Sequence, residues 1–242
     1  MGKEPLGRFL ARNPFPHRLT DGLFYREKMR AVHRVAPDHS VKRVLEIGGG
    51  RSGLAAMLYP DAEVFTVDID PELAGQSLAD TVFVCGDARR LPFPDGFFDA
   101  VTLLDVLEHV PEDDRAAAEA LRVVRPGGAI LVSTPNHTWR FPYYGFMRGI
   151  CRPEAELMAE WGHVRRGYAR KDLEALFGCP PAAAASFINP VTAFFHDLAF
   201  SRLPWRARRL LYLLTAPFTL LGYVLHQPSS PGTETAYLWR RA

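Results

Sequence analysis

The chain has 242 residues, of which 48% are hydrophobic and 23% charged, a composition typical of a folded globular protein. Its 29 Lys and Arg residues nearly balance its 27 Asp and Glu residues, and the net charge of +2 argues against a dedicated nucleic-acid-binding protein. The three cysteines form no C-x-x-C pair, which excludes a disulfide framework and a cysteine-based zinc site. We therefore expect one domain in a reducing, cytoplasmic compartment.

Apolar runs alternate with helical patterns along the first half of the chain. A helix is expected over residues 20–36, where Pro37 ends it. The apolar runs that follow are nearly continuous, as in parallel strands whose two faces are both covered by helices. We expect Arg125 to Gly128 to stop the helix before the fifth strand. The expected strands are Arg43–Ile47, Glu63–Asp68, Thr81–Cys85, Phe97–Leu104 and Ala129–Ser133, and the expected helices are Ser52–Leu58, Pro71 to about Leu78 and Pro111–Val124.

The pattern changes after Pro135. Residues 137–168, the cap segment, carry scattered aromatic, Arg and His residues and predict loops and short helices over a cleft. A helix over Lys171–Phe177 and a strand over Ala182–Ile188 are expected next, and the alternating segment Thr233–Arg240 predicts a last edge strand. The alternation of strands and helices predicts a doubly wound α/β fold with a mostly parallel sheet.

The sharpest local feature is the segment VLEIGGGRSG (44–53), in which a buried strand turns through glycines into a helix. Glycines permit positive φ angles and a close approach of a ligand to the backbone, and a helix N-terminus offers free N–H groups. Gly48, Gly50 and Gly53 also satisfy the spacing G-x-G-x-x-G. Taken alone, that spacing points to a dinucleotide site.

Acidic residues occur at the ends of four successive expected strands. Asp68, 22 residues after Glu46, can accept hydrogen bonds from both ribose hydroxyls of either NAD or S-adenosylmethionine. Glu46 distinguishes between these two candidate ligands. A carboxylate beside the glycine turn repels the pyrophosphate of NAD and attracts the α-amino group and sulfonium of S-adenosylmethionine. Asp87 can accept from an adenine amine, and Asp105 adds another negative group. Together the four acids predict a site for a cationic, adenosine-bearing methyl donor.

At this point the sequence resembles the class I S-adenosylmethionine-dependent methyltransferases, near the branch of ubiquinone and menaquinone biosynthesis. The resemblance is strong over residues 40–136 and weak over 137–188. One departure is Ser52, where the family usually has Gly. The matching segments are VLEIGGG (44–50), VFTVDID (64–70), CGDARRLPFPDGFFDAV (85–101), LLDVLEHV (103–110), LRVVRPGGAILVSTPN (121–136) and GHVRRGYARKDLEALF (162–177).

The resemblance implies a Rossmann-like fold with a seven-stranded sheet and a single methyltransferase domain. It also implies S-adenosylmethionine as the cofactor and S-adenosylhomocysteine as the product. The expected domain covers 1–242, with a core in 40–136, 170–190 and 233–241, the cap over 137–168 and an apolar helical insertion over 190–231. The implied cofactor-binding residues are Glu46, Gly48, Gly49 and Gly50 at the methionine end, Asp68 at the ribose, Ile69, Asp87 and Ala88 at the adenine, and Asp105 over the methionine moiety.

Methyl transfer from a sulfonium needs alignment and a dry cavity, and a hydroxyl acceptor also needs a base. His163, in the cap segment, is the favoured base, with His109 as a second catalytic candidate and the alternative that His109 is structural. Aromatic cap residues can stack an acceptor or, equally well, pack the cap itself. The candidate substrate-binding residues are His137, Trp139, Phe141, Tyr144 and Trp161.

The resemblance also raises the question of whether the protein binds a metal ion. Some quinone-type O-methyltransferases of this branch bind a divalent ion through the stretch that matches Asp105, Glu108 and His109. Their spacing of i, i+3, i+4 places them on one face only if the segment is helical. The sequence leaves the metal unassigned.

The expected function is methyl transfer to a small, apolar or aromatic acceptor by in-line displacement in a closed cleft. O-methylation is favoured and C-methylation remains open. One alternative is an NAD-dependent oxidoreductase, against which stand the missing Tyr-x-x-x-Lys pair of short-chain dehydrogenases and Glu46. A second alternative is a non-catalytic binding module that keeps the methyltransferase fold.

One further segment is the apolar run Leu210–Leu225, which has 16 residues and contains Pro217. A membrane-spanning helix needs about 17–25 apolar residues, so this run is short for that role. Arginines precede it, at 202, 206, 208 and 209, and basic residues beside an apolar helix suit a segment lying in a membrane surface. The alternative is a helical hairpin packed on the substrate face. The expected partners are a small-molecule, lipid-like acceptor and a membrane surface through 202–226, with no nucleic acid. No signal peptide is expected.

Overall fold

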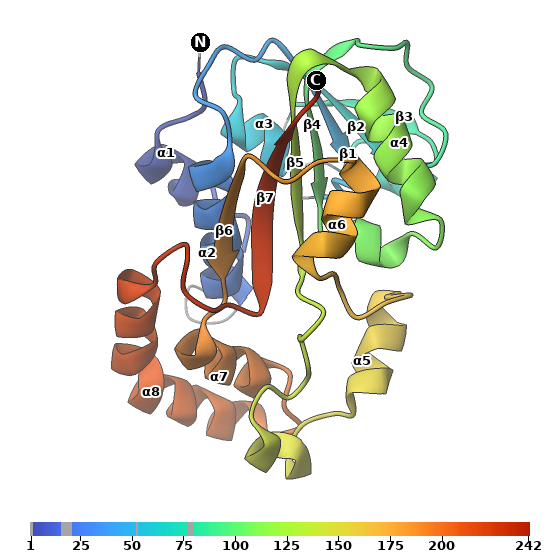
Figure 1. Ribbon diagram of the computed structural model, residues 1–242. Coiled ribbons are helices and arrows are strands. Elements are labelled where there is room, and N and C mark those ends of the chain that lie inside the picture. The colour runs from blue at the N-terminus through green and yellow to red at the C-terminus, as the bar shows by residue number, and fades with distance from the viewer. Residues whose placement is uncertain (1, 16–20, 52, 77–79) are drawn as a thin grey trace.

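The structure is a computed structural model that describes residues 2–15, 21–51, 53–76 and 80–242. A seven-stranded sheet with strand order β3-β2-β1-β4-β5-β7-β6 forms its centre (Figure 1). Every neighbouring pair is parallel except the two that involve β7, which runs antiparallel to β5 and β6. The predicted doubly wound, mostly parallel seven-stranded sheet is confirmed. The strands are β1 Arg43–Ile47, β2 Glu63–Asp68, β3 Val82–Cys85, β4 Phe98–Leu104, β5 Val124–Pro135, β6 Ala183–Phe187 and β7 Glu234–Arg240.

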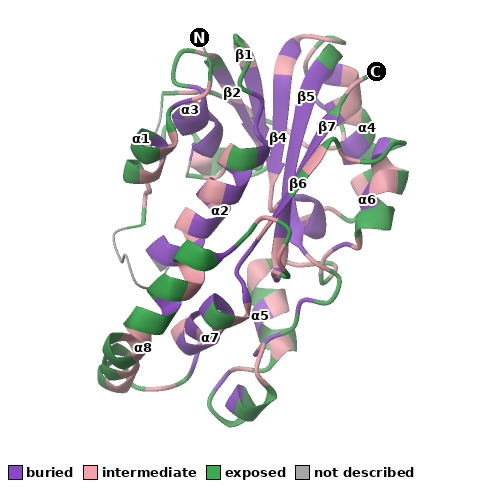
Figure 2. Cartoon of the chain, turned by 60° about the vertical axis from the view of Figure 1, so that its left-hand side comes forward, coloured by how far each residue is buried: buried purple, intermediate pink, exposed green. Residues whose placement is uncertain are grey.

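Helices cover both faces of the sheet (Figure 2). One apolar cluster joins α1, α2, α3 and α7 to one face, and a second joins α4 and α6 to the other. Because helices cover both faces, residues 44–47 of β1, 100–103 of β4 and 128–135 of β5 are buried, and most of them are apolar. The helices are α1 Leu6–Ala11, α2 Asp21–Val35, α3 Leu54–Leu58, α4 Asp113–Val123, α5 Glu154–Trp161, α6 Arg170–Phe177, α7 Pro190–Ala199 and α8 Trp205–Leu225, with 3-10 turns at Pro71–Leu73, Leu107–His109 and Gly145–Gly149.

Strand β5 corrects one prediction, because it continues through the expected stop signal. The register shifts between its two ends, with Phe98 opposite Val124 and Ala100 opposite Ala129. The extra residues form a bulge, in which a Cβ on Gly128 would lie 2.6 Å from a methyl group of Val124. The Pro-Gly-Gly sequence therefore bends a strand rather than separating a helix from one.

Strand β7 corrects a second prediction, since it is not an edge strand. It lies between β5 and β6, and its residues 235–239 are buried. The edges are β3 and β6. Alternation in the sequence indicates a strand, but the position in the sheet depends on non-local pairing that the pattern does not contain.

The prediction of a helix from Pro71 to about Leu78 is wrong, because the described residues of this segment form only the 3-10 turn Pro71–Leu73. Asp70 caps this turn by accepting a hydrogen bond from the backbone of Glu72. Gly75 then takes a positive φ of 71°, which ends the turn, and residues 77–79 lie outside the described chain.

The expected apolar insertion before the last strand is present as α7 and α8, which pack against each other as a hairpin (Figure 1). They cross closely where Gly222 meets Val191 and where the Asn189 side chain donates to the Gly222 carbonyl at 2.9 Å. The prediction of a hairpin inside 210–225 is wrong, because α8 is one helix that continues through Pro217. No helix in the described ranges is both long and apolar enough to cross a membrane.

Candidate active site

A cavity of about 350 Å³ lies beyond the carboxyl ends of β1, β2, β3 and β4, and we term it the donor cavity. Such a position is where open α/β sheets bind ligands, because adjacent crossovers leave a crevice there. Residues from four strand ends meet in it, as the sequence predicts. The lining includes the predicted Gly48, Asp68, Ile69, Asp87, Ala88 and Asp105.

The glycine turn shapes one wall of the donor cavity. Gly48 has a φ of 64°, and a Cβ there would lie 2.7 Å from a methyl group of Val106. The positive φ and the lack of room for a Cβ both favour glycine here. Without a side chain, the backbone itself forms this part of the cavity wall. Gly49 and Gly50 belong to the same turn but are not part of the cavity lining. Gly49 instead covers the carboxylate of Glu46.

Glu46 lies beneath this turn, is only 2% exposed and does not line the donor cavity. Its Oε1 accepts a hydrogen bond from the backbone N–H of Ala55 at 3.1 Å, at the start of α3. Burial raises the pKa of Glu46 to about 7. The placement thus differs from the expectation that Glu46 meets the methionine end of the donor directly: the carboxylate holds the turn in place.

Asp68 and Ile69 stand side by side on the cavity wall at the end of β2. Asp68 accepts the backbone N–H of Asp70 at 3.1 Å, which orients the carboxylate in a tight turn. The Ile69 side chain is 71% exposed and apolar. A carboxylate beside an open apolar surface fits a ribose next to a flat base.

Asp87 has a partner that the sequence analysis missed. Both of its carboxylate oxygens accept hydrogen bonds from Arg89, the shortest at 2.6 Å, and Arg89 also pairs with Glu112 at 2.6 Å. The hydrogen bonds with Arg89 lower the pKa of Asp87. Asp87 is therefore held rigidly ionised at the cavity, and Arg89 belongs to the lining itself.

A second cavity of about 380 Å³, the acceptor cavity, shares Asp105 with the donor cavity. The Asp105 carboxylate accepts from Lys28 Nζ and from Ser133 Oγ, both at 2.6 Å. The rest of the lining comes from the N-terminal segment, α2, the β6–α7 connection, α7 and β7. Besides Lys28 and Asp105 it consists of Phe15, Phe24, Tyr25, Phe187, Ile188, His196, Phe200 and Glu234.

Two backbone positions mark the acceptor cavity as strained. Among the described residues, non-glycine φ angles above zero occur at Asp105 (57°) and Ile188 (53°), and both residues line this cavity. A β-branched residue with a positive φ is a clear outlier. Such strain gathers at binding and catalytic sites, where the surrounding structure holds it.

The charged groups of the acceptor cavity shift one another's pKa values. Burial alone would lower the pKa of Lys28, but the carboxylates of Asp105 and Glu234, with Tyr25, more than offset this and keep it fully protonated. Burial raises the pKa of Glu234 well above its usual range, and the nearby negative charge of Asp105 adds to the rise. Burial lowers the pKa of His196 to about 4.

The aromatic cap residues predicted to bind substrate line neither cavity. Trp139 and Phe141 are buried in a separate apolar cluster. Trp161 packs against Phe200 with ring centroids 5.2 Å apart, so the cluster supports the wall of the acceptor cavity from behind. These contacts agree with the alternative that the aromatic residues pack the cap itself, here against α7, while their role as substrate contacts stays a prediction.

Two other predicted substrate-binding residues also lie away from the cavities. Tyr144 donates its hydroxyl to the carbonyl of Pro190 at 2.8 Å, and its backbone N–H donates to Asp197. His137 is exposed, and its backbone donates to the carbonyl of Tyr168. Both residues hold the cap segment to the core.

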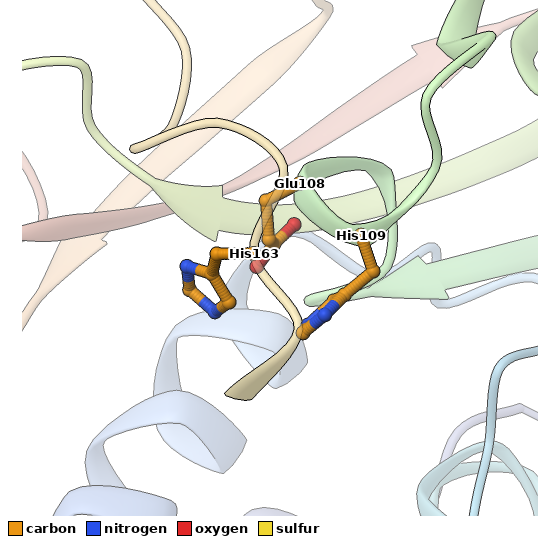
Figure 3. Close-up of side chains that lie close together, drawn as sticks. All are labelled: Glu108, His109 and His163. Atoms are coloured by element: carbon orange, nitrogen blue, oxygen red, sulfur yellow. The ribbon is translucent and has the colours of Figure 1, made fainter. Parts of the chain in front are cut away.

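The predicted catalytic histidines lie together beside Glu108 (Figure 3). The His109 and His163 rings meet edge to face at 4.6 Å, and His109 lines the donor cavity whereas His163 lines neither cavity. Burial, followed by the charge of His109, lowers the pKa of His163 to about 4. Burial, followed by the charge of Asp105, raises the pKa of Glu108 to about 8.

The same three side chains form a possible metal-binding group. One ligand atom from each of Glu108, His109 and His163 lies within 4.8 Å of the others. One carboxylate and two imidazoles suit a first-row divalent ion such as zinc. The set predicted from the sequence contained Asp105 in place of His163. Residues 107–109 form a 3-10 turn rather than an α-helix, and Asp105 is bound to Lys28.

Comparison with known proteins agrees with this architecture. Residues 45–132 match a family model described as a methyltransferase domain. The chain is 37% identical over 114 residues to a demethylmenaquinone methyltransferase of Renibacterium salmoninarum, which covers 45% of this chain and 46% of that protein. It is 36% identical over 118 residues to the ubiquinone/menaquinone biosynthesis C-methyltransferase UbiE of Cupriavidus necator, covering 44% and 47%. The chain thus spans about half the length of the curated relatives it matches.

Two solved structures share the fold over nearly the whole chain. The N-methyltransferase NodS from Bradyrhizobium japonicum, in complex with S-adenosyl-L-homocysteine, has a TM-score of 0.57 at 15% identity and covers 98% of this chain and 96% of its own. A possible histamine N-methyltransferase from Thermotoga maritima has a TM-score of 0.58 at 17% identity, covering 98% and 94%.

The strand order, the glycine turn and the donor cavity define the class I methyltransferase fold. Residues 45–132 match a methyltransferase domain, and the curated relatives that the chain resembles over about half of their length include ubiquinone and menaquinone biosynthesis enzymes. The match to the family model spans the donor cavity and not the residues that build most of the acceptor cavity.

Proposed function

We propose that the protein transfers a methyl group from S-adenosylmethionine to a small hydroxylated aromatic acceptor. The observation that carries this proposal is the pair of cavities joined at Asp105. One cavity has the glycine turn and strand-end acids of a methyl-donor site, and the other has aromatic walls and a buried ion pair. A two-substrate transfer needs two such sites in contact, because the reacting atoms have to approach within bonding distance.

The donor cavity fits S-adenosylmethionine by its own geometry. Asp68 would accept the ribose hydroxyls, and exposed Ile69 would pack on the adenine. Gly48 would admit the methionine end against the backbone, and Asp105 would face the positive charge from the far side. When bound, the donor supplies an activated methyl group on a sulfonium. Glu46, Gly49 and Gly50 would act by holding the turn, while Asp87 and Ala88 would border the adenine edge.

The acceptor cavity favours an aromatic ring with a hydroxyl group. Phe24, Tyr25 and Phe187 offer apolar surface, and a flat ring fits between such side chains. Lys28 is a buried cation that would stabilise a phenolate oxygen. Glu234 lines the same cavity, and because its pKa is raised, its deprotonated form is a stronger base than an exposed carboxylate and becomes more populated as the pH rises.

The base favoured by the sequence is therefore revised in this proposal. His163 lines neither cavity, and its pKa near 4 makes it a weak proton acceptor. Glu234 touches the acceptor cavity directly. We assign proton removal to Glu234. We assign to His109, His163 and Glu108 either the support of the cavity rim or the binding of a divalent ion.

The methylated atom is either the hydroxyl oxygen or a ring carbon next to it. The sequence favoured oxygen, whereas the relatives that match the donor half carry the name C-methyltransferase. A phenolate stabilised by Lys28 is nucleophilic at both atoms. We propose ring-carbon methylation of a quinol-type acceptor: Glu234 would take the hydroxyl proton, and the ring carbon would take the methyl group from the sulfonium and then lose its own proton to water, which restores the aromatic ring.

Calorimetry tests the donor half. S-adenosylmethionine and S-adenosylhomocysteine should bind with one site per chain, and NAD should not bind. Binding of NAD alone would favour the oxidoreductase alternative and overturn the donor assignment.

Turnover tests the acceptor half. With a short-chain naphthoquinol and S-adenosylmethionine, mass spectrometry should detect a product one methylene heavier. Boron tribromide cleaves an aryl methyl ether but not a C-methyl group, so treatment of the product separates the two atoms. Donor binding without turnover on a panel of phenols and quinols would favour the non-catalytic alternative.

A further inference from the structure

Many residues of helix α8 are exposed (Figure 2), and large apolar side chains are among them along most of its length. Their exposed fractions range from 46% to 68%. Soluble monomeric proteins rarely leave so many large apolar side chains together on one surface without a binding role. The residues are Trp205, Leu210, Leu213, Leu214, Phe218, Leu220, Leu221, Val224 and Leu225, and we term them the α8 stripe.

The α8 stripe is one face of an amphipathic arrangement. Its members recur at intervals of three and four residues, so most of them lie on a single side of the helix. The other side packs on the protein: Leu211 and Tyr212 contact the buried cluster of the cap and α7, and Thr219 is only 1% exposed. The helix is therefore held by its inner face, and its outer face is free of intramolecular packing in the described part of the chain.

Charge is distributed unevenly along the helix. From Leu210 to Leu225 there is no Asp, Glu, Lys or Arg, and α8 contains no acidic residue at all. Its first turn carries Arg206 and Arg209, which are both exposed. Arg208 differs from them, because its side chain donates to the carbonyl of Ala199 at 2.7 Å.

We propose that α8 lies in the surface of an anionic lipid bilayer, with the stripe in the acyl boundary and Arg206 and Arg209 among the headgroups. A long uncharged apolar face bordered by arginines complements such a surface in both polarity and charge. The helix lies in the interface and does not cross the bilayer, since no described helix is long and apolar enough to do so.

This surface places the acceptor cavity near the lipid. Helix α7 packs against α8 and also contributes His196 to the acceptor cavity. Because the α8 stripe lies on the side of α8 that faces away from the protein, α7 and α8, each about 10 Å across, both lie between the cavity and the membrane face along this line. Resting on the proposed function, this arrangement selects a lipid-like acceptor that reaches the cavity from the bilayer.

Vesicle flotation with the full chain tests the membrane contact without any methyl transfer, so it fails independently of the proposed function. We expect the protein to float with vesicles of phosphatidylcholine and phosphatidylglycerol and to bind them about tenfold more tightly than phosphatidylcholine alone. High salt should reduce this difference. No flotation with either vesicle overturns the proposal, and equal binding to both overturns its anionic part.

Variants locate the contact. Leu214→Gln with Phe218→Gln and Leu221→Gln should lower vesicle binding by at least about tenfold, because less apolar surface enters the lipid. Arg206→Gln with Arg209→Gln should lower binding to the anionic vesicles only. Val82→Gln is the control for Leu214→Gln, since Val82 is a 48% exposed apolar residue on the edge strand β3. Unchanged binding of S-adenosylhomocysteine shows that each variant is folded.

A second measurement needs no destabilising change. Lipids brominated on their acyl chains should quench Trp205 fluorescence, and Trp205→Phe should remove most of the quenching. Sedimentation in the absence of lipid should show a monomer. A stable dimer that the triple variant dissociates, without quenching by brominated lipid, would assign α8 to a second copy of the chain and overturn the proposal.

Discussion

The two cavities differ in how the chain builds them. The donor cavity comes from residues 47–111, at the ends of successive strands, and each wall follows the previous one along the sequence. The acceptor cavity joins residues from 15 to 234. Only Asp105 belongs to both. A site made by a local, repeated strand–helix rhythm is visible in a sequence, whereas a site assembled from distant segments is not.

The difference also appears in the charged groups. Asp68 and Asp87 at the donor cavity are partly exposed, so they remain available to a ligand. Lys28 and Glu234 at the acceptor cavity are taken out of water together with Asp105, and each therefore depends on the others. We expect substitutions at the donor cavity to affect only the affinity for the methyl donor. Substitutions at the acceptor cavity should affect both turnover and stability.

The largest effect is expected for the acceptor base. Glu234→Gln should lower turnover of a quinol by about 10²- to 10⁴-fold through loss of general-base catalysis, with donor affinity unchanged in calorimetry. His163→Gln is the comparison, and it should lower turnover by much less. If His163→Gln lowers turnover more than Glu234→Gln does, His163 is the base and our assignment of the acceptor cavity is wrong.

The next largest effect is expected at the residue that joins the cavities. Lys28→Met removes the cation from the 2.6 Å pair with Asp105 and should lower the free energy of unfolding by about 1–3 kcal/mol, because the partly buried Asp105 carboxylate then loses a charge-assisted hydrogen bond. Lys42→Met makes the same change at an exposed lysine and should have little effect. Urea unfolding measures both, and similar losses for the two variants would contradict a buried ion pair.

A smaller effect is expected in the donor cavity alone. Asp68→Ala should weaken S-adenosylmethionine binding by about 1–3 kcal/mol through lost charge-assisted hydrogen bonds. Asp61→Ala, at an exposed turn residue near the start of the same strand, is the matched control. An unchanged dissociation constant for Asp68→Ala would count against the ribose role.

The most gradual effect, spread over several pH units, is a pH dependence behind the acceptor cavity. Glu27 on α2 accepts a hydrogen bond from Thr192 on α7 at 3.1 Å, and burial raises its pKa to about 8. The folded state holds this proton more tightly than the unfolded state does. Stability should therefore fall as pH rises from about 4.5 to about 8, by up to about 1.4 kcal/mol per pH unit.

The Glu27→Gln variant should reduce this slope, because glutamine does not titrate, while Glu46 and Glu108, whose pKa values burial also raises, still contribute. Glu63→Gln, an exposed carboxyl on β2, should leave the slope intact. Thermal or urea unfolding across the pH range measures all three proteins, and an identical slope in wild type and Glu27→Gln would show that Glu27 is not the group responsible.

The sequence by itself determined the sheet class, six of its strands to within one residue at each end, and several residues of the donor cavity. Each of these depends on local chemistry: strand hydrophobicity, glycines that permit positive φ, and acids directly after strands. The start of β5 and the end of the Pro71 turn were missed because proline and glycine have more than one local use, in bulges as well as in stops.

Only the tertiary structure decided the acceptor cavity. Lys28 and Glu234 lie about 200 residues apart and carry no motif that pairs them. Likewise, the sequence showed that residues 210–225 are apolar, but not that α8 is one helix whose outer face stays exposed, nor that the cap aromatics turn toward α7. These outcomes depend on which distant surfaces pack together, and packing is decided by the whole chain at once.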